Sequence, residues 1–363
     1  MTYSLSRRHL LAAAAVACAA VAAPSLADTP SGKANSAGAA APKRVAPAAG
    51  RPLRIYAITF RGMTEVEKGF EEHFASRKLP VQIIYRDINR DPTRLPALLE
   101  EIRAAKPDLI YTWGTTVTLG IVGPYDTPTP EKFISDIPVV FTLVAAPTLA
   151  KIVAEDGRAR PNLTGVVHVA PVSAQIQAMA AYRPFKSLGV LYTPTEQNSV
   201  VIVNELRKLG IEKGFTLVER PFKLDANNKP IAEGTADLVR ELKEHKAQWL
   251  YLPPDSFLGT QAQDTIIPAA MAHGLPTFAS TEQLMQAGAL SGLVSKYHSV
   301  GQFTAFKAEQ ILFEKVPPSL IPIEPLKRFS YQVRISAAER LKLMPPLPMF
   351  NYAEIITDAP VPQ

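Results

Sequence analysis

Residues 53–60 read LRIYAITF and residues 81–88 read VQIIYRDI, two short apolar runs rich in β-branched and aromatic residues. Runs of this kind predict strands that are buried on both faces. Between them Val66, Phe70 and Phe74 recur at helical spacing, which predicts one buried helix face. A strand, a helix and a second strand in this order predict a βαβ unit with parallel strands.

The same alternation continues along the chain and then begins again. Residues 95–102 place leucine and isoleucine at i, i+3, i+4 and i+7, which predicts an amphipathic helix, and 109–113 and 139–143 predict further strands. Two such series predict an α/β protein with two Rossmann-like, doubly wound lobes. The leftover segments 289–313 and 316–363 are expected to cross between the lobes. After Asn162 the second series has strands at 165–169, 188–192, 216–221, 249–252 and 276–279, and helices at 172–182, 196–209, 232–245 and 260–272.

The first residues of the chain have the pattern of an export signal. Arg7 and Arg8 precede the apolar run 10–23, and Ser-Leu-Ala at 25–27 forms a small-x-small cleavage site. This predicts a signal peptide over 1–27, because the apolar run is shorter than the roughly 20 residues of a membrane span. Residues 28–51 have a linker composition. We expect a periplasmic protein, exported by the twin-arginine or the general route, with lipid anchoring at Cys18 as the less favoured alternative.

Charge and chemistry motifs exclude several classes of protein. Residues 1–51 contain six basic residues and one acidic residue, so the other 312 residues have 33 basic and 32 acidic ones, which argues against nucleic-acid binding. The single cysteine and the six scattered histidines predict no metal site, and His168 is expected to be a packed core histidine. No nucleotide-binding or hydrolase motif is present, so we expect no cofactor and no catalytic residues.

Polar residues follow five of the predicted strands. The carboxyl ends of strands in open α/β sheets are where ligands bind, so these loops predict a common site. Each loop also has a simpler interpretation, because Thr115, Thr116, Thr193 with Glu196, Thr195 and Asp255 stand where helix caps are expected. The five loops are 61–64, 113–116, 193–199, 253–256 and 280–282.

Aromatic and basic residues beside these loops suggest the kind of ligand. Phe60, Trp113 and Tyr297 are expected to cover an apolar or aromatic body, although an aromatic residue at such a position also fits the core. Arg61 either clamps a carboxylate or is a solvated charge at the rim. Helix starts and threonine hydroxyls favour a carboxylate. The predicted ligand-binding residues are Phe60, Arg61, Trp113, Thr115, Thr116, Glu196, Asn198, Ser199, Asp255, Thr281 and Tyr297.

Several short motifs resemble those of one known family. They are DIPVVF at 136–141, NLTGV at 162–166, VLYTPTEQNS at 190–199, GAL at 288–290 and AEQIL at 308–312. Over roughly 53–345 the chain resembles the ABC transporter substrate-binding proteins whose members take up tryptophan and related amino acids. The resemblance implies the type I periplasmic binding protein fold, with two lobes, three crossovers and the ligand between the lobes. We expect one lobe from 52–163 plus 289–318 and the other from 164–288 plus 319–363.

The resemblance also implies site residues and one departure. Thr115 and Thr116 match the family's first-lobe threonine loop, and Asp255 matches its aspartate after a second-lobe strand. Glu196, Asn198 and Ser199 match its second-lobe helix start. The family usually has aspartate before the proline at Pro147, where this chain has Ala146. If that aspartate meets a ligand amine, its absence bears on amino-acid recognition.

These observations predict an extracytoplasmic solute-binding protein of an ABC importer. We expect a monomer that binds a small carboxylate-bearing solute, an amino acid or a related organic acid, by hinge closure of the lobes, and that delivers it to a membrane permease. One alternative is a sensory subunit that presents its ligand to a membrane receptor. The other is a secreted α/β hydrolase, since a catalytic triad is assembled by the fold and leaves no fixed order in the sequence.

Overall fold

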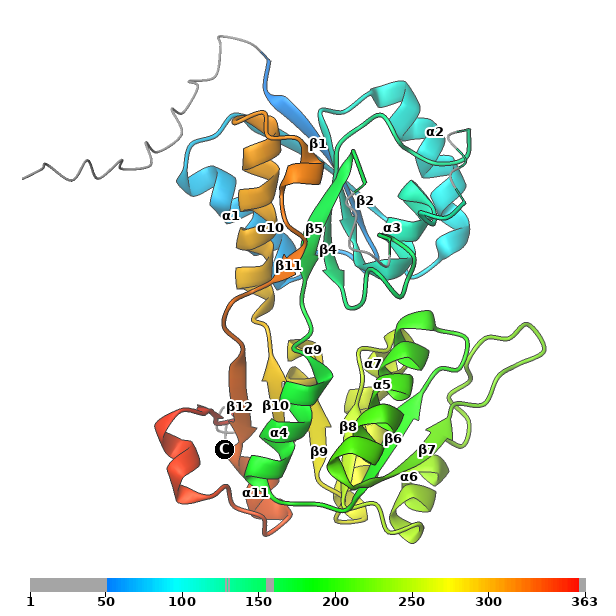
Figure 1. Cartoon of the computed structure of the whole chain (residues 1–363), viewed down its shortest axis with the longest axis vertical. Helices are drawn as coiled ribbons and strands as arrows, with labels where there is room; N and C mark the ends of the chain where they lie inside the picture. Colours follow the sequence, from blue (N-terminus) through cyan, green and yellow to red (C-terminus); the bar gives the residue numbers. More distant parts are fainter. Residues whose placement is uncertain (1–50, 128, 130, 155–159, 359–363) are drawn as a thin grey trace, which may run out of the picture. The chain divides into compact units, whose positions relative to one another are not determined.

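The computed structural model describes residues 51–127, 129, 131–154 and 160–358 (Figure 1). The predicted signal peptide, Cys18 and the linker up to residue 50 lie outside the described residues. Among the described residues no helix is both long enough and apolar enough to cross a membrane.

The first lobe is built on a parallel six-stranded sheet in the order β11-β5-β4-β3-β1-β2. The register pairs Ile55 with Ile83 on one side and with Leu109 on the other, so apolar side chains lie next to each other across the sheet. The strands are β1 (Leu53–Thr59), β2 (Val81–Asp87), β3 (Leu109–Trp113), β4 (Val139–Val144), β5 (Leu163–Val167) and β11 (Glu324–Pro325).

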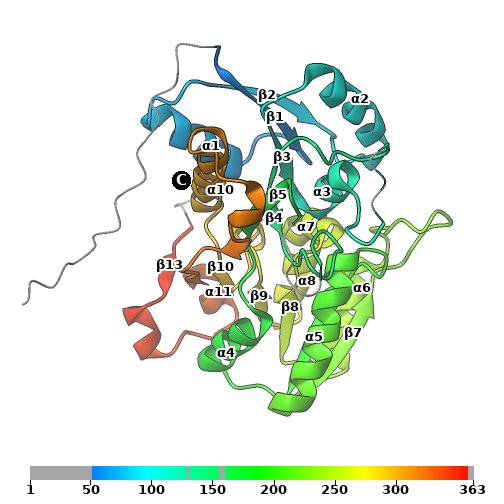
Figure 2. The ribbon, with the colours of Figure 1, turned by 45° about the horizontal axis from the view of Figure 1, so that its top comes forward.

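Helices cover both faces of this sheet. Figures 1 and 2 show α1 (Glu65–Ser76) and α10 (Tyr297–Leu312) on one face and α2 (Leu95–Ala105) and α3 (Gly114–Val122) on the other. The predicted Phe70 face of α1 lies in the core with Ala305 and Ala308 of α10. The short 3-10 helices of this lobe are Pro92–Arg94 and Pro318–Leu320.

The helices α1 and α10 pack in close contact because glycines face their backbones. A Cβ atom at Gly69 would lie 2.1 Å from the carbonyl oxygen of His298, and one at Gly301 would lie 1.9 Å from that of Val66. Neither distance is possible for a real side chain, so both positions require glycine at this separation. This packing fixes the start of α10, which contributes Tyr297 to the site described below.

The second lobe is built on a seven-stranded sheet in the order β13-β12-β10-β9-β8-β6-β7, in which only the β10–β12 pair is antiparallel. Its core holds Trp249, Tyr251 and Phe278. The strands are β6 (Ser187–Tyr192), β7 (Thr216–Pro221), β8 (Trp249–Leu252), β9 (Thr277–Ala279), β10 (Ser291–Val294), β12 (Ser330–Arg334) and β13 (Glu354–Ile356).

This sheet is also covered on both faces. One apolar cluster contains residues of α4 (Val172–Tyr182), α5 (Gln197–Lys213) and α11 (Ile335–Arg340). The other contains residues of four helices, namely α6 (Thr235–Glu244), α7 (Ser256–Gln261), α8 (Ile267–Ala272) and α9 (Glu282–Gln286). A π-helical turn at Ala262–Ile266 joins α7 to α8, and a 3-10 helix covers Leu347–Asn351. The predicted fold class, α/β with two doubly wound lobes joined by crossovers, is confirmed.

Strand pairing places the crossings a few residues away from the expected lobe boundaries. We expected the strand near 165 in the second lobe, but β5 pairs with β4 in the first sheet. We expected 289–294 in the first lobe, but β10 pairs with β9 in the second sheet. We expected 324–325 in the second lobe, but β11 pairs with β5 in the first. Hydropathy predicted strands at β5 and β10 but not the sheet that each joins, and it predicted no strand at β11. The crossings between the sheets fall at 168–171, 295–296 and 326–329.

Candidate ligand-binding site

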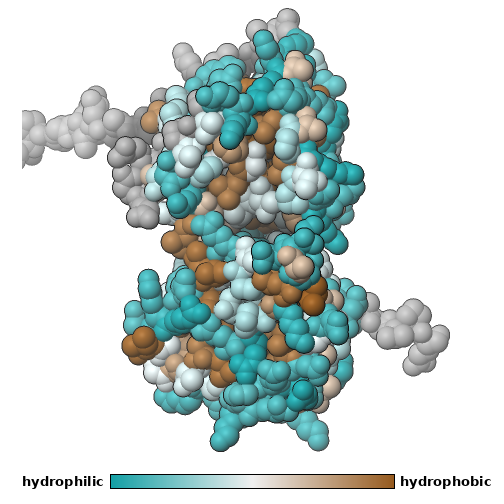
Figure 3. Space-filling view, turned by 90° about the vertical axis from the view of Figure 1, so that its right-hand side faces the viewer, coloured by the Kyte–Doolittle hydropathy of each residue, from teal (hydrophilic) through white to brown (hydrophobic). Residues whose placement is uncertain are grey.

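One cavity is lined by residues of both lobes. It encloses about 770 Å³ between its lining atoms, open solvent included. Figure 3 shows brown and white side chains gathered at the level between the lobes. All predicted ligand-binding residues except Ser199 line this cavity, and their role in binding stays a prediction. The lining residues that we predicted are Phe60, Arg61, Trp113, Thr115, Thr116, Glu196, Asn198, Asp255, Thr281 and Tyr297.

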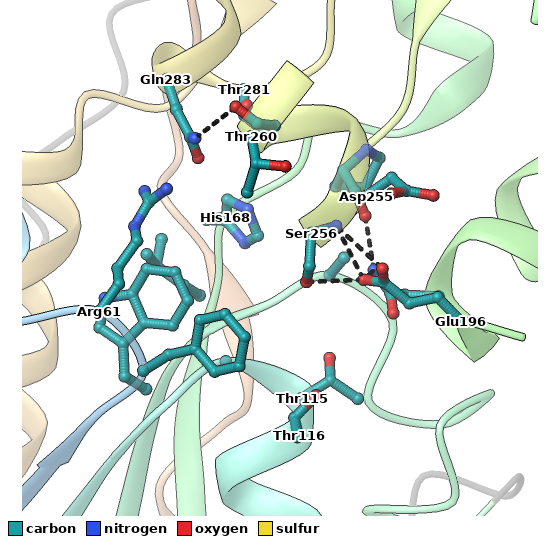
Figure 4. Close-up of a pocket in the computed structure, with 18 of the residues that line it drawn as sticks. Arg61, Thr115, Thr116, His168, Glu196, Asp255, Ser256, Thr260, Thr281 and Gln283 are labelled. Carbon is teal, nitrogen blue, oxygen red and sulfur yellow. Dashed lines mark hydrogen bonds between the residues drawn. The ribbon is translucent and has the colours of Figure 1, made fainter. Parts of the chain in front are cut away.

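The first-lobe wall combines an aromatic stack with a cation. Phe60 follows β1 and Trp113 ends β3, two adjacent strands, and their rings stack with centroids 5.9 Å apart and planes 10° apart. The guanidinium carbon of Arg61 lies 5.1 Å from the centroid of the Trp113 ring, a cation–π geometry. Figure 4 shows the Arg61 side chain at the cavity. The wall therefore combines two nearly parallel aromatic rings with a positive charge over one of them.

No carboxylate of the described residues lies within ion-pair distance of Arg61 or Arg90. Burial lowers the pKa of Arg61, and the nearby positive charge of Arg90 lowers it further, while Tyr297 and Glu67 act in the opposite direction. Sequence reasoning missed Arg90, although it follows β2 at the same sheet edge. Two like charges without an acidic partner, one of them half-buried, favour an anion in the cavity.

The start of α3 leaves polar groups free. Gly114 opens the helix with φ of +76°, and Trp113 occupies the N-cap position with no side-chain cap. The alternative that Thr115 or Thr116 caps this helix is therefore wrong. Within the described part of the chain neither hydroxyl has a hydrogen-bond partner, and both residues line the cavity. Free hydroxyls and the first backbone N–H groups of a helix suit an anionic group.

Asp255 caps a helix in the second-lobe wall. Its carboxylate accepts hydrogen bonds from Leu258 N at 2.8 Å, Thr193 N at 2.6 Å, Thr193 Oγ1 at 3.0 Å and Ser199 Oγ at 2.7 Å. The capping alternative holds for Asp255. Ser199 is fully buried, and it lies against Asp255 and not among the residues that line the cavity. Thr193 caps no helix, because its hydroxyl is bonded to Asp255.

Glu196 and Asn198 are also held by protein partners. The Glu196 carboxylate accepts from Ser256 N at 2.9 Å, Ser256 Oγ at 2.9 Å and Asn198 Nδ2 at 2.9 Å, as the dashed lines in Figure 4 show in part. Asn198 Nδ2 donates as well to the Pro254 carbonyl at 2.5 Å. Burial, and then the negative charge of Asp255, raise the pKa of Glu196 to about 7. This wall is thus a hydrogen-bonded loop pair whose acceptors already have donors.

The rest of the cavity lining described here comes from residues beside the segments that cross between the lobes. Tyr297 begins α10 directly after the crossing at 295–296, and its backbone N–H donates to Glu282 of α9 at 2.5 Å. His168 follows β5 at the first crossing, lines the cavity, and has its ring 6.1 Å from that of Tyr297. His168 is buried, as expected of a packed histidine, and it also lines the cavity. The predicted strand 165–169 placed it inside a strand, whereas β5 ends at Val167.

The family comparison agrees with this geometry. The model of the family described as ABC transporter substrate binding protein matches residues 57–354. The chain belongs to this family. The resemblance seen in the sequence motifs is therefore confirmed, and the family is one of extracytoplasmic solute-binding proteins and not of enzymes.

Individual relatives are distant. A tyrosine-binding protein of Clostridioides difficile is 21% identical over 235 residues, which cover 64% of this chain and 62% of that protein, so the chain matches about three fifths of its length. The structure of an ABC domain in complex with L-Trp from Streptococcus pneumonia covers 84% of this chain and 100% of its own, with 20% identity and a TM-score of 0.69. A conserved domain protein from Vibrio cholerae covers 85% and 100%, with 20% identity and a TM-score of 0.72. These structures show the shared fold.

The substrate-binding protein departs from the expected family pattern at Ala146. Ala145 lines the cavity, whereas Ala146 does not, and the Ala146 carbonyl accepts a hydrogen bond from Ala150 N at 2.9 Å. Neither side chain has a hydrogen-bonding group. These two side chains therefore offer no hydrogen-bond acceptor to a ligand amine.

The described residues form neither a metal-binding cluster nor a hydroxyl–histidine pair. No group of three or more histidine, cysteine, aspartate or glutamate side chains there could hold a metal ion. In the same part of the chain no serine or threonine hydroxyl is hydrogen-bonded to a histidine ring, the pair that a hydrolase nucleophile requires. Further lining residues that the sequence did not single out are Arg90, Leu143, His168, Ser256, Gly259, Thr260 and Gln283.

Proposed function

We propose that this substrate-binding protein is the extracytoplasmic solute receptor of an ABC importer and that it binds a small carboxylate-bearing solute, an amino acid or a related organic acid, in the cavity between its lobes. One observation carries the proposal. The Arg61 guanidinium lies over Trp113 in a cavity lined by both lobes and has no acidic partner among the described residues.

Several hydrogen-bond donors on one wall support the proposal that the solute carries a carboxylate. An arginine fork binds a carboxylate through two parallel hydrogen bonds, and a partly buried guanidinium without a partner leaves that geometry open. The hydroxyls of Thr115 and Thr116 stand at the start of α3, where free N–H groups point along the helix axis. A carboxylate near these groups would satisfy donors that the protein leaves free.

The stacked rings support the proposal that the rest of the solute is apolar or aromatic. The rings of Phe60 and Trp113 are nearly parallel, and the Arg61 guanidinium lies over the Trp113 ring. A tyrosine-binding relative and a related structure in complex with L-Trp support the same class of solute.

Hinge closure is supported by the way in which the lobes are joined. The chain passes between the sheets at three short segments, and an isolated bridge pairs Val169 of the first with Val294 beside the second. One hydrogen bond, from Gln197 Nε2 of α5 to the Leu149 carbonyl at 2.6 Å, joins loops of opposite lobes. A solute that contacts both walls would favour the state in which such contacts form.

The test is calorimetric titration of wild type and Arg61→Gln with tryptophan, tyrosine and their deaminated carboxylic acids, and with the corresponding neutral amides. Loss of a charged hydrogen-bond donor costs about 1.5–3 kcal/mol, so Arg61→Gln should bind carboxylates about 10- to 100-fold more weakly. Wild type should discriminate against the amides, and the variant should not. Arg340→Gln removes the same charge from an exposed site at the end of α11, outside the cavity and the crossings, and serves as the control. Equal affinity of wild type for acids and amides would refute the carboxylate site.

The remaining alternatives concern what the ligand-bound protein does next. A sensory subunit would bind the same solutes, so the titration does not separate it from an importer component. Reconstitution with the membrane permease would do so, because a transport receptor stimulates ATP hydrolysis by its permease. The titrations also test the hydrolase alternative, since hydrolysis of one of the amides would appear as continuing heat after saturation.

A further inference from the structure

Two arginines reach the cavity from neighbouring strand ends of the first lobe. Arg61 follows β1 and Arg90 follows β2, and both line the cavity. The backbone N–H of Arg90 donates to the Phe60 carbonyl at 2.7 Å, so the two arginines start from adjoining points of the backbone. Within the part of the chain that the structure describes, neither guanidinium forms an ion pair with a carboxylate, and the Arg90 side chain donates no hydrogen bond.

Arg90 stands at a turn position that favours glycine. Asn89 and Arg90 are the central residues of a turn that a hydrogen bond from Asp91 N to the Ile88 carbonyl closes at 2.9 Å, and their φ values are +52° and +61°. Two positive φ values in succession are typical of a type I′ turn, whose preferred sequence is Asn-Gly. Here arginine stands in the place of that glycine. A side chain is disfavoured in this conformation, and residues that are kept in it gather at functional sites.

The acidic residues beside this turn have other partners. Asp87 ends β2 and accepts a hydrogen bond from the Thr59 hydroxyl at 3.2 Å. Asp91 accepts from the Thr93 hydroxyl at 2.7 Å. Arg90 is exposed, so its guanidinium is accessible to a solute in the cavity. The turn therefore holds a free cation at the cavity although acids lie close to it in the sequence.

The acidic residues of the opposite wall do not neutralise the two arginines. Figure 4 draws Arg61 on one side of the cavity and Asp255 and Glu196 on the other. Asp255 accepts a hydrogen bond from Thr193 N at 2.6 Å. Glu196 accepts one from Ser256 N at 2.9 Å. Each of these carboxylates is thus held by donors of its own lobe, and the first-lobe wall has two positive charges to itself.

We propose, on the basis of the proposed function, that the solute is a dicarboxylic acid and that Arg61 and Arg90 each bind one of its carboxylates. A guanidinium group binds a carboxylate through two parallel hydrogen bonds, so two free guanidinium groups match two carboxylates. A monocarboxylate leaves one of two like charges without a counter-charge, whereas a dicarboxylate compensates both. Because the arginines start from adjoining backbone positions, the carboxylates are separated by a short carbon chain. An apolar or aromatic substituent of this chain then contacts the rings of Phe60 and Trp113.

The experiment measures what a second carboxylate contributes on a constant phenyl body. Calorimetry with the full chain compares 3-phenylpropionate with benzylmalonate, benzylsuccinate and 2-benzylglutarate, whose carboxylates are separated by one, two and three carbons. The monoamides of the three diacids have nearly the same shape and one charge fewer. At least one diacid should bind about 10- to 100-fold more tightly than its own monoamides and than 3-phenylpropionate.

Substitution of Arg90 tests which group binds the second carboxylate. Arg90→Gly removes the guanidinium and supplies the residue that the turn favours, so it should melt no lower than wild type. In this variant the preferred diacid should bind within about threefold of its monoamides. The control is Lys246→Gly, which removes a positive charge from an exposed residue outside the cavity whose φ is +65°. It should keep the wild-type preference for the diacid.

The outcomes separate this proposal from the proposed function. If the monocarboxylates bind and no diacid binds more tightly than its monoamides, the proposal is overturned and the proposed function stands. A preference for a diacid that persists in Arg90→Gly overturns the role of Arg90. If Arg90→Gly melts well below wild type, Arg90→Gln, which keeps a side chain at the turn, decides the question by the same ratio. If none of these acids binds, the proposed function fails and this proposal fails with it.

Discussion

The hydrogen bonds of Asp255 imply that its loss destabilises the second lobe. Asp255→Ala removes the cap of α7 and leaves Thr193 N and Ser199 Oγ without their acceptor, all in a buried position. A lost cap costs about 1 kcal/mol, and each buried donor without a partner costs about 1–3 kcal/mol. Because the Asp255 site opens into the cavity, water can bind part of the donors that Asp255 leaves. We therefore expect the free energy of unfolding to fall by about 3 kcal/mol in total.

The two tryptophans of the chain allow the stability of the second lobe to be measured separately by tryptophan fluorescence. Trp249 is fully buried in the second-lobe core, and Trp113 belongs to the first lobe, so a Trp113→Phe background reports on Trp249 alone. With a urea m-value of about 2–3 kcal/mol/M, a loss of about 3 kcal/mol lowers the midpoint of unfolding by about 1–1.5 M. Asp264→Ala, an exposed aspartate on the turn after α7, should shift it by less than about 0.3 M.

Two results would refute this reasoning. A midpoint for Asp255→Ala within the range of the Asp264→Ala control would mean that the capping contacts contribute nothing. A normal midpoint together with a large loss of solute affinity would mean that Asp255 acts on the ligand directly, which was the interpretation favoured by the sequence motif.

Three further outcomes follow from other contacts. Burial raises the pKa of Glu196 to about 7, so the folded state still binds a proton at pH values where the unfolded state, with a pKa near 4.5, has released it. The free energy of unfolding should therefore fall as the pH rises from about 4.5 to 7. Glu196→Gln should flatten that part of a curve of unfolding midpoint against pH. Gly301→Ala forces its methyl group against the Val66 carbonyl of α1 and should cost at least about 2 kcal/mol in thermal unfolding. Thr115→Val and Thr116→Val each remove a hydroxyl that has no protein partner, so each should weaken carboxylate binding about 2- to 10-fold with an unchanged melting temperature.

Much of the architecture follows from hydropathy alone. The period-2 and period-3.6 patterns locate most of the strands and helices of both sheets, because a buried strand or helix face must be apolar over its whole length. Sheet membership does not follow in the same way. The strands β5, β10 and β11 are short and lie near the crossings, and their partners depend on which sheet edge is free in three dimensions. Strand β11 is only Glu324–Pro325, so it carries no apolar pattern at all.

The candidate site was predictable as a set of loops and less so residue by residue. Loops at the carboxyl ends of parallel strands converge by topology, which is why the predicted Arg61, Trp113 and Glu196 line one cavity. His168 was missed because a two-residue error in the strand boundary turned an end position into an interior one. Ser199 was included because sequence does not show whether a hydroxyl on the first turn of a helix points to the ligand or to a neighbouring loop.

The two walls of the cavity differ in whether their polar side chains already have hydrogen-bond partners in the protein, which the residue composition does not reveal. Threonine, glutamate, asparagine and aspartate occur after strands in both lobes, yet Thr115 and Thr116 have no protein partners whereas Asp255 and Glu196 have their acceptors filled. A free group can contribute its full hydrogen bond to a solute, whereas a filled one must first lose a partner. Substitutions in the first-lobe wall should therefore change affinity without changing stability, and those in the second-lobe wall should change stability first. Measuring both quantities for the same variants separates the side chains that recognise the solute from those that hold the loops in place.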